Sequence, residues 1–310
     1  MSKMATREAY GKTLAELIVS NQNIIVLDAD LSKSTKTNDA KVVCPERHFN
    51  MGIAEANMMA TAAGLATSGN IVFASTFAMF AAGRAFEQIR NSIGYPHLNV
   101  KICATHAGIS VGEDGASHQT FEDLALMRTI PGMVVICPSD DIETTQVIKT
   151  VSEYEGPCYV RLGRSVVETV NDDPNYKFEI GKGYQLRKGT SKVALISNGL
   201  LTSEAIKAYN TLKEENIEVS VYNFPTIKPL DKKLLLEIAN NYETIITCEE
   251  HGVIGGLGSA IAEYLSEVKP TKIIKVGQLD TYGESGKPNQ LLKKYKMDAD
   301  YIVSKVKENI

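Results

Sequence analysis

Cysteine is scarce in this sequence and follows no recognisable motif. The chain has 310 residues and five cysteines, which are widely spaced and include no Cys-x-x-Cys pair. A disulfide framework would call for an even set at close spacings, and a zinc site would call for paired ligands. The pattern therefore indicates neither, and it favours a cytoplasmic location.

An excess of positive charge is also absent. Lysine and arginine total 33 against 37 aspartates and glutamates, which gives a formal net charge of -4. This balance leaves no broad cationic face for nucleic acid or for an anionic membrane surface, so we expect neither as a partner. A small anionic substrate is still compatible, because a few local arginines are enough to bind it.

No continuous apolar run is long enough to predict a membrane span. Residues 1–12 carry charges throughout and lack the apolar core of a signal peptide. Residues 56–83 contain no charged side chain, but a turn cluster at residues 67–70 divides them into two elements. With 44% hydrophobic and 23% charged residues, the composition is that of a globular protein.

What the sequence does contain is an alternation of short apolar runs and helical segments. Candidate strands lie at residues 24–27, 71–74, 100–105, 133–137 and 158–162. Candidate helices lie at residues 6–20, 54–66, 82–93, 121–129 and 143–154. Continuous apolar strands separated by helices predict a parallel sheet covered on both faces.

A polar segment separates this first unit from a second one. Residues 171–190 are rich in Asp, Asn, Pro, Gly and Lys, which is typical of a linker. Beyond it, candidate strands lie at residues 193–197, 218–222, 244–248 and 272–276, and candidate helices at 203–215, 232–240 and 257–267. The sequence therefore predicts an α/β protein with two Rossmann-like domains in series.

A loop dense in polar side chains follows the strand at residues 100–105. It contains His106, Glu113, Asp114 and His118. In open α/β sheets, ligands bind beyond the carboxyl ends of the strands, and imidazoles there can move protons near neutral pH. The alternative is a solvated loop whose acids cap the next helix. The density of polar groups favours a functional loop.

Glu55 is the only charged residue between Arg47 and Arg84. It begins a helix of small and apolar residues, where partial desolvation would raise its pKa and let it hold a proton to donate. It could equally occupy the first helical turn only because a carboxylate is favoured at the positive end of the helix dipole. The residues alone do not decide between these two readings.

Three further groups of residues are candidates for binding. Phe77 and Phe80 follow a strand and could clamp an aromatic ligand, although such a pair is more often ordinary core. A phosphate could be bound by cationic and hydroxyl side chains, each of which is by itself more typical of a surface: Arg7, Ser34 and Arg164. The glycine-rich residues 252–258 lack the Gly-x-Gly-x-x-Gly spacing of a dinucleotide site and favour close strand-to-helix packing.

Taken together, these motifs resemble the transketolase family. The resemblance rests on Gly-Ile-Ala-Glu at residues 52–55, on Ser-Thr-Phe at 75–77 and on the His-to-His loop at 104–119. It covers essentially the whole chain but only the C-terminal half of a full-length transketolase. It implies a pyrimidine-binding domain over residues 1–170, a linker over 171–190 and a smaller C-terminal domain over 191–310.

The resemblance implies thiamine diphosphate as the cofactor, shared with another chain. Glu55 would hydrogen-bond N1′ of the aminopyrimidine and so promote removal of the thiazolium C2 proton. Phe77 and Phe80 would stack on the aminopyrimidine, with Leu31 and Asp30 beside it. The family's third pocket aromatic falls near a glycine here, residue 83, so this side of the pocket must be closed differently.

The resemblance also implies two sets of substrate-binding residues. The sugar hydroxyls would be met by Asp114 and by His106 and His118, which would also assist proton transfers. The sugar phosphate would be bound by Arg7, Ser34 and Arg164. The reaction would be the transfer of a two-carbon ketol unit from a ketose phosphate to an aldose phosphate.

One part of the family's site has no counterpart in this sequence. The family binds the diphosphate and its metal through a Gly-Asp-Gly stretch followed by Asn, whereas Gly-Glu-Asp-Gly at residues 112–115 belongs to the substrate loop. We therefore expect no metal ligands on this chain, with Mg²⁺ or Ca²⁺ held mainly by an N-terminal transketolase subunit. A heterotetramer around a two-fold axis is expected, and the chain alone should be inactive.

Two other functions compete with this one. The chain could be half of another thiamine-dependent carboligase, such as a deoxyxylulose-phosphate synthase-like enzyme or a transketolase for an unusual sugar phosphate. It could also be a non-catalytic regulatory subunit that keeps the fold. Glu55 and the two loop histidines weigh against the last, because a structural subunit has no physical need for them.

Overall fold

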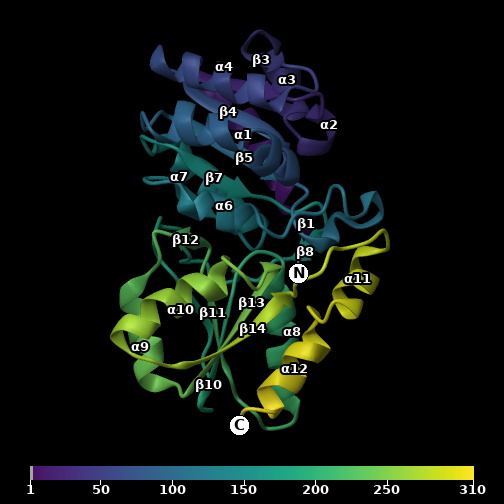
Figure 1. Ribbon diagram of the computed structural model, residues 1–310, viewed down its shortest axis with the longest axis vertical. Coiled ribbons are helices and arrows are strands. Elements are labelled where there is room, and N and C mark those ends of the chain that lie inside the picture. The colour runs from purple at the N-terminus through teal and green to yellow at the C-terminus, as the bar shows by residue number, and fades with distance from the viewer. Residues whose placement is uncertain (1–2) are drawn as a thin grey trace.

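Two sheets, each with helices packed around it, lie one above the other along the long axis of the molecule (Figure 1). The computed structural model describes residues 3–310. The upper sheet has the strand order β12-β6-β7-β5-β4-β2-β3. Its parallel strands are β2 (Ile24–Asp28), β3 (His48–Asn50), β4 (Ile71–Phe77), β5 (Val100–Thr105), β6 (Val134–Ile136) and β7 (Cys158–Arg161).

Both faces of this sheet are buried, as the continuous apolar strands predict. Along β4, Val72 and Ala74 belong to one core cluster and Phe73 between them to the other, because successive side chains point to opposite faces. The main helices of this unit are α1 (Thr6–Ser20), α3 (Asn38–Val43), α4 (Glu55–Thr67), α6 (Asp123–Thr129) and α7 (Asp141–Glu153). The expected parallel α/β fold is confirmed.

The sequence predicts one α-helix at residues 82–93, and the structure differs from this prediction. Two π-helical turns, η2 (Phe80–Arg84) and η3 (Ile89–Gly94), flank a single α-turn, α5 (Phe86–Gln88). A π-turn widens the hydrogen-bonding step by one residue, which a pattern of apolar spacing does not reveal. Such turns are frequent at functional sites, and η2 carries Phe80.

The lower sheet has the order β14-β13-β10-β11-β9. It is formed by β9 (Tyr184–Arg187), β10 (Val193–Ser197), β11 (Ser220–Asn223), β13 (Thr244–Gly252) and β14 (Lys272–Gln278), of which β9 runs antiparallel. Its helices are α8 (Leu201–Glu214), α9 (Lys232–Asn241), α10 (Leu257–Val268), α11 (Pro288–Lys294) and α12 (Ala299–Lys307). Helices α11 and α12 were not predicted from the sequence.

The two units are more closely interleaved than two domains in series. Strand β9 lies inside the interval expected as a linker and joins the lower sheet. Strand β12 (Thr226–Lys228) follows β11 in the chain but pairs with β6 at the edge of the upper sheet. A short antiparallel pair, β1 (Lys3–Ala5) with β8 (Val166–Glu168), and a short helix, α2 (Ser32–Thr35), complete the upper unit. Across residues 3–310, no helix has the length and apolar composition needed to cross a bilayer.

Candidate active site

The candidate residues gather beyond the carboxyl ends of β2, β4 and β5. These neighbouring strands are parallel and in register, with Asp28 opposite Ser75 and Phe77 opposite Thr105, so the segments that follow them leave the sheet at the same edge. Two non-glycine residues at this edge, Asp30 and His106, have left-handed backbones with φ of 62° and 55°. Such conformations cost energy and cluster at functional sites, where the surrounding structure holds them in place.

Glu55 is the first residue of α4 and only 3% exposed, so the expected burial is observed. Its two carboxylate oxygens lie 3.2 and 3.4 Å from Nη1 of Arg84. The half-exposed guanidinium of Arg84 also lies over the ring of Phe80, with Cζ 4.1 Å from the ring centroid. The π-turn that ends at Arg84 thus brings a cation to the buried carboxylate, which sequence reasoning missed.

Two aromatic rings form the wall opposite the loop histidines. The Phe77 and Phe80 rings are nearly parallel, with centroids 5.8 Å apart. The imidazole of His106 stacks on Phe77 at a centroid distance of 3.8 Å, and His118 meets Phe80 edge-on at 5.3 Å. Residues twelve positions apart in the loop therefore converge on the same aromatic pair.

The hydrogen bonds of His106 fix which nitrogen carries its proton. Nη1 of Arg7, which can only donate, lies 3.2 Å from Nε2 of His106, so Nε2 is the acceptor. The proton is then on Nδ1, which is 2.9 Å from Oγ1 of Thr105 and donates to it. Burial, with the nearby charges of Arg7 and Arg164, lowers the pKa of His106 to about 3.

His106 is therefore expected to stay neutral across the physiological pH range. Its Cε1–H signal in a proton NMR titration should not move between about pH 8 and pH 5, because its pKa lies below that window rather than near its ordinary value of about 6.5. The chain has five histidines, and His106→Phe identifies the signal by its loss. A titration of this signal with a midpoint near 6.5 would show that the imidazole is not buried against the two arginines.

Two of the three phosphate candidates, Arg7 and Arg164, lie near His106, and the third, Ser34, contacts Arg7. Arg7 Nη1 donates to the carbonyl oxygen of Ser34 at 2.9 Å, which places Arg7 and Ser34 side by side. Arg164 is near enough for its charge to act on both Arg7 and His106. Its Nη1 lies 2.9 Å from Oε2 of Glu113, a partner supplied by the substrate loop. The structure thus brings together segments that are more than 150 residues apart in the sequence.

Three other candidates have contacts of their own, and the carbonyl oxygen of one of them, Leu31, accepts from the amide of Ser34 at 2.8 Å. Asp30 is exposed and accepts a hydrogen bond from Nδ2 of Asn50 at 2.9 Å. The amide of Leu31 donates to Asp28 at 2.6 Å, and Asp114 is exposed at the end of η4 (Ile109–Asp114). Within residues 3–310, no hydrogen bond or ion pair joins these three to Glu55 or to the two loop histidines.

The glycine-rich residues 252–258 do not form a nucleotide site. The amides of Leu257 and Gly258, at the N-terminus of α10, donate to the buried carboxylate of Glu249 at 2.6 and 2.9 Å. A helix N-terminus is where a dinucleotide phosphate would bind, and here the chain's own carboxylate takes that place. Close packing is the correct interpretation of these glycines.

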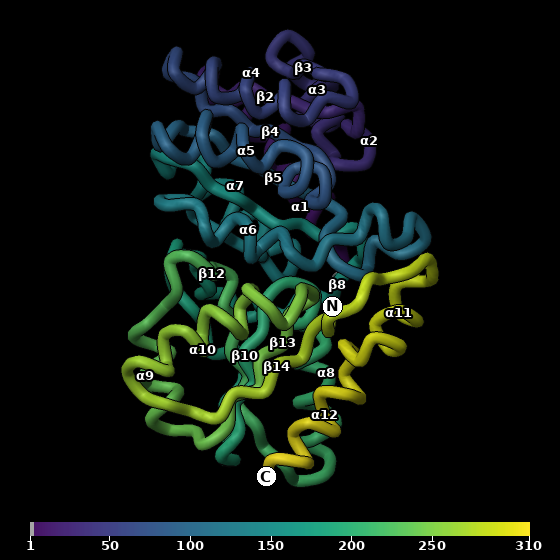
Figure 2. Tube along the Cα trace, viewed as in Figure 1, coloured from purple at the N-terminus to yellow at the C-terminus, as the bar shows by residue number. Residues whose placement is uncertain are grey.

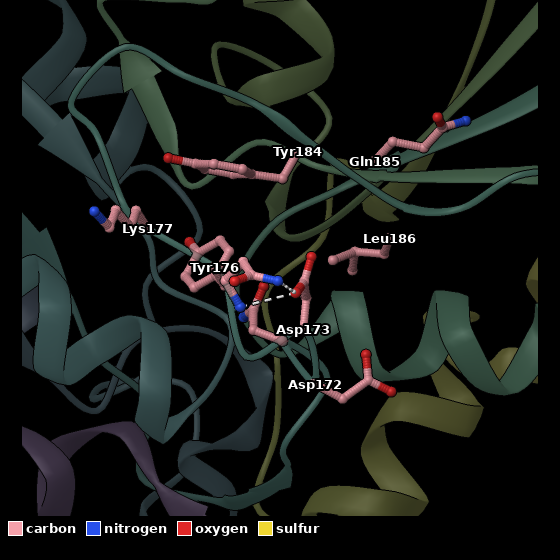
Figure 3. Close-up of a pocket in the computed structure, with 9 residues that line it drawn as sticks. Asp172, Asp173, Tyr176, Lys177, Tyr184, Gln185 and Leu186 are labelled. Atoms are coloured by element: carbon pink, nitrogen blue, oxygen red, sulfur yellow. Dashed lines mark hydrogen bonds between the residues drawn. The ribbon is translucent and has the colours of Figure 1, made fainter.

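Two further observations concern other binding chemistry. In the described part of the chain, no group of three or more His, Cys, Asp or Glu side chains is placed to hold a metal ion. A hollow of about 350 Å³ is lined by residues between 171 and 186, and none of the candidate site residues named above is among them (Figure 3). Its carboxylates have partners of their own, since Asp172 pairs with Arg187 at 3.2 Å and Asp173 accepts from the amide of Asn175 at 2.8 Å.

Comparison with known proteins agrees with this geometry. Residues 2–169 match the family model of the transketolase pyrimidine binding domain, and residues 181–302 match that of the transketolase C-terminal domain. A Methanocaldococcus jannaschii protein named as a transketolase C-terminal section is 48% identical over 98% of this chain and 96% of its own length. A solved structure described as a split gene transketolase, inactive beta4 tetramer, is 53% identical, with a TM-score of 0.91 and 98% of each chain covered.

The chain belongs to the transketolase family. Within that family it corresponds to the C-terminal half. Rat transketolase is 37% identical over 98% of this chain, and the match spans 49% of the rat protein.

Proposed function

We propose that this chain is the C-terminal subunit of a two-chain, thiamine diphosphate-dependent transketolase that moves a two-carbon ketol unit from a ketose phosphate to an aldose phosphate. The observation that carries the proposal is the buried carboxylate of Glu55 beside the paired rings of Phe77 and Phe80, with two histidines on the same rings. A nucleotide-binding function has no comparable support, because Glu249 fills the helix terminus it would use.

The residues around Glu55 fit an aminopyrimidine. Arg84 presents a planar, cationic group of nitrogen donors that meets Glu55 in an ion pair and also covers the face of Phe80. An aminopyrimidine offers the same two features, a flat π-system and ring nitrogens that pair with a carboxyl group. We infer that the cofactor's pyrimidine takes the place of Arg84 on Glu55 and Phe80. When bound, thiamine diphosphate supplies the carbanion chemistry.

The protein's own groups handle the sugar. His106 offers a proton acceptor at Nε2 that Arg7 now occupies, and it is suited to accept from a substrate hydroxyl rather than to donate a proton. We propose that His118 and Asp114 bind the sugar hydroxyls together with His106. Arg7, Ser34 and Arg164 are the proposed phosphate group, and Arg164 would exchange Glu113 for the substrate phosphate. Leu31 and Asp30 are assigned to the edge of the cofactor.

The diphosphate and its Mg²⁺ or Ca²⁺ are assigned to an N-terminal subunit. This assignment is supported by the sequence, which lacks the Gly-Asp-Gly stretch followed by Asn with which the family binds the diphosphate and its metal. We propose a heterotetramer around a two-fold axis, with cofactors at the interfaces between subunits.

The decisive test measures ketol transfer by this chain alone and together with its partner subunit. Both assays contain thiamine diphosphate, Mg²⁺, a ketose phosphate donor and an aldose phosphate acceptor. We expect activity in the two-chain complex and none in the isolated chain. Activity of the chain alone would contradict the shared site, and a cofactor-loaded complex without transfer from any ketose phosphate would contradict the reaction.

A further inference from the structure

The substrate loop is attached to the second domain at several points. Figure 2 shows it running beside the segment that leads into α11. Ile109 is fully buried in the apolar core of the lower unit, together with Leu195 and Leu291. At the far end of the loop, Nε2 of Gln119 donates to the carbonyl oxygen of Glu284 at 2.9 Å. The loop therefore packs against the second domain, while its two histidines contact Phe77 and Phe80 of the first domain.

A buried glutamate makes the most specific of these attachments. Glu250 lies in β13 and is 4% exposed, and its Oε1 accepts a hydrogen bond from the amide of Ser110 at 2.6 Å. Gly108, with a φ of 77°, lies so close that a Cβ there would be 2.5 Å from the Glu250 carboxylate. A side chain at residue 108 would therefore be strained, and the loop backbone lies directly against the Glu250 carboxylate.

Glu250 is also fixed from the side of the upper sheet. Nη2 of Arg161, at the end of β7, donates to the backbone carbonyl of Glu250 at 2.8 Å. The Arg161 side chain is held in turn by Asp123, whose Oδ2 accepts from Nε at 2.9 Å. Burial raises the pKa of Glu250, and the hydrogen bond from Ser110 together with the nearby charge of Arg161 offsets part of that cost.

We propose that the second domain positions the substrate loop for catalysis and that Glu250 is the positioning residue. Its carboxylate fixes the peptide plane at Ser110, four residues from His106, and so sets the position of the imidazole on Phe77. In this way the second domain contributes to the reaction although none of its side chains contacts the substrate. The catalytic part of the proposal rests on the proposed transketolase function.

The first test measures amide hydrogen exchange of the peptide containing residues 106–119 in the isolated chain. Glu250→Ala removes the acceptor of Ser110 and should speed exchange of this peptide about tenfold or more, the size expected for losing a hydrogen bond to a charged group. Exchange across α4 should stay unchanged. Glu250→Gln keeps an oxygen acceptor and should restore most of the protection. Glu267→Ala, which removes an exposed glutamate of α10 in the same domain, is the matched control.

The second test measures ketol transfer by the two-chain complex. Glu250→Ala should lower kcat about 10- to 100-fold with little change in KM, because the histidines are misplaced while the phosphate group is intact. Glu250→Gln should recover most of kcat. Should the alanine variant unfold, Glu250→Asp serves instead, since it keeps the charge but shortens the reach to Ser110.

Unchanged loop exchange in Glu250→Ala, or a glutamine variant as impaired as the alanine one, would overturn the proposal. A wild-type complex without ketol transfer would instead refute the proposed function. The exchange data would still decide whether Glu250 holds the loop.

Discussion

In the assembled two-chain complex, Glu55→Gln is expected to lower kcat for ketol transfer by about 10² to 10⁴-fold, the usual contribution of a positioned acid or base. The amide has nearly the same shape as the carboxyl group but cannot take up or release the proton. Burial at 3% exposure leaves little room for a water molecule to replace it. Steady-state kinetics with saturating thiamine diphosphate measure the effect.

The matching control is Glu153→Gln, an exposed glutamate at the end of α7, which should leave kcat unchanged. Calorimetric titration of the complex with cofactor separates chemistry from binding. If Glu55→Gln kept full activity with normal cofactor affinity, Glu55 would have no part in the proton transfer.

The second large effect is on stability. Arg161→Met should reduce the free energy of unfolding by about 3–5 kcal/mol, because it leaves the buried carboxylate of Asp123 without its cation and removes the nearby positive charge from Glu250. Methionine preserves most of the side-chain volume, so the loss reports on charge rather than on a cavity. Since domains are stable by only about 5–15 kcal/mol in total, urea denaturation resolves a change of this size easily.

Arg187→Met provides the contrast for this prediction. Arg187 pairs with Asp172 at 3.2 Å, but the aspartate is largely exposed, so the expected loss is below about 1 kcal/mol. Equal small losses in the two variants would mean that the buried carboxylates accept protons or water at little cost. Arg161 would then not be essential to the packing of the two units against each other.

Most of the fold could be predicted because most of its strands are buried on both faces. Segments such as β4 and β5 are continuous apolar runs bounded by polar turns, and they lie where the sequence places them. Strand β12 was missed because it is short and pairs with a segment some 90 residues earlier in the chain. The π-turns were missed because a shift of one hydrogen bond leaves the hydrophobic spacing almost unaltered.

The site divides in the same way. The convergence of His106 and His118 could be predicted from the sequence, because their loop follows a strand whose carboxyl end opens at this edge, whereas the residues alone favoured an ordinary core role for Phe77. The ion pair of Arg84 with Glu55 could not, since the two residues are 29 positions apart and are joined only by tertiary packing. The same holds for the left-handed backbone of His106 and for the contact of Glu250 with Ser110.

The crossing of β12 has a consequence for how the molecule can be divided. The edge of β6 gains its neighbour only when residues 226–228 are present, well after the second sheet has begun. A fragment cut near residue 190 would therefore carry a bare strand edge, an open template for pairing with other chains. On the ribosome, the first sheet likewise stays unfinished after β7 while more than 60 further residues are made. A cut between the two domains in sequence therefore does not separate the two sheets. A chimera between relatives that exchanges the upper sheet must also exchange residues 226–228.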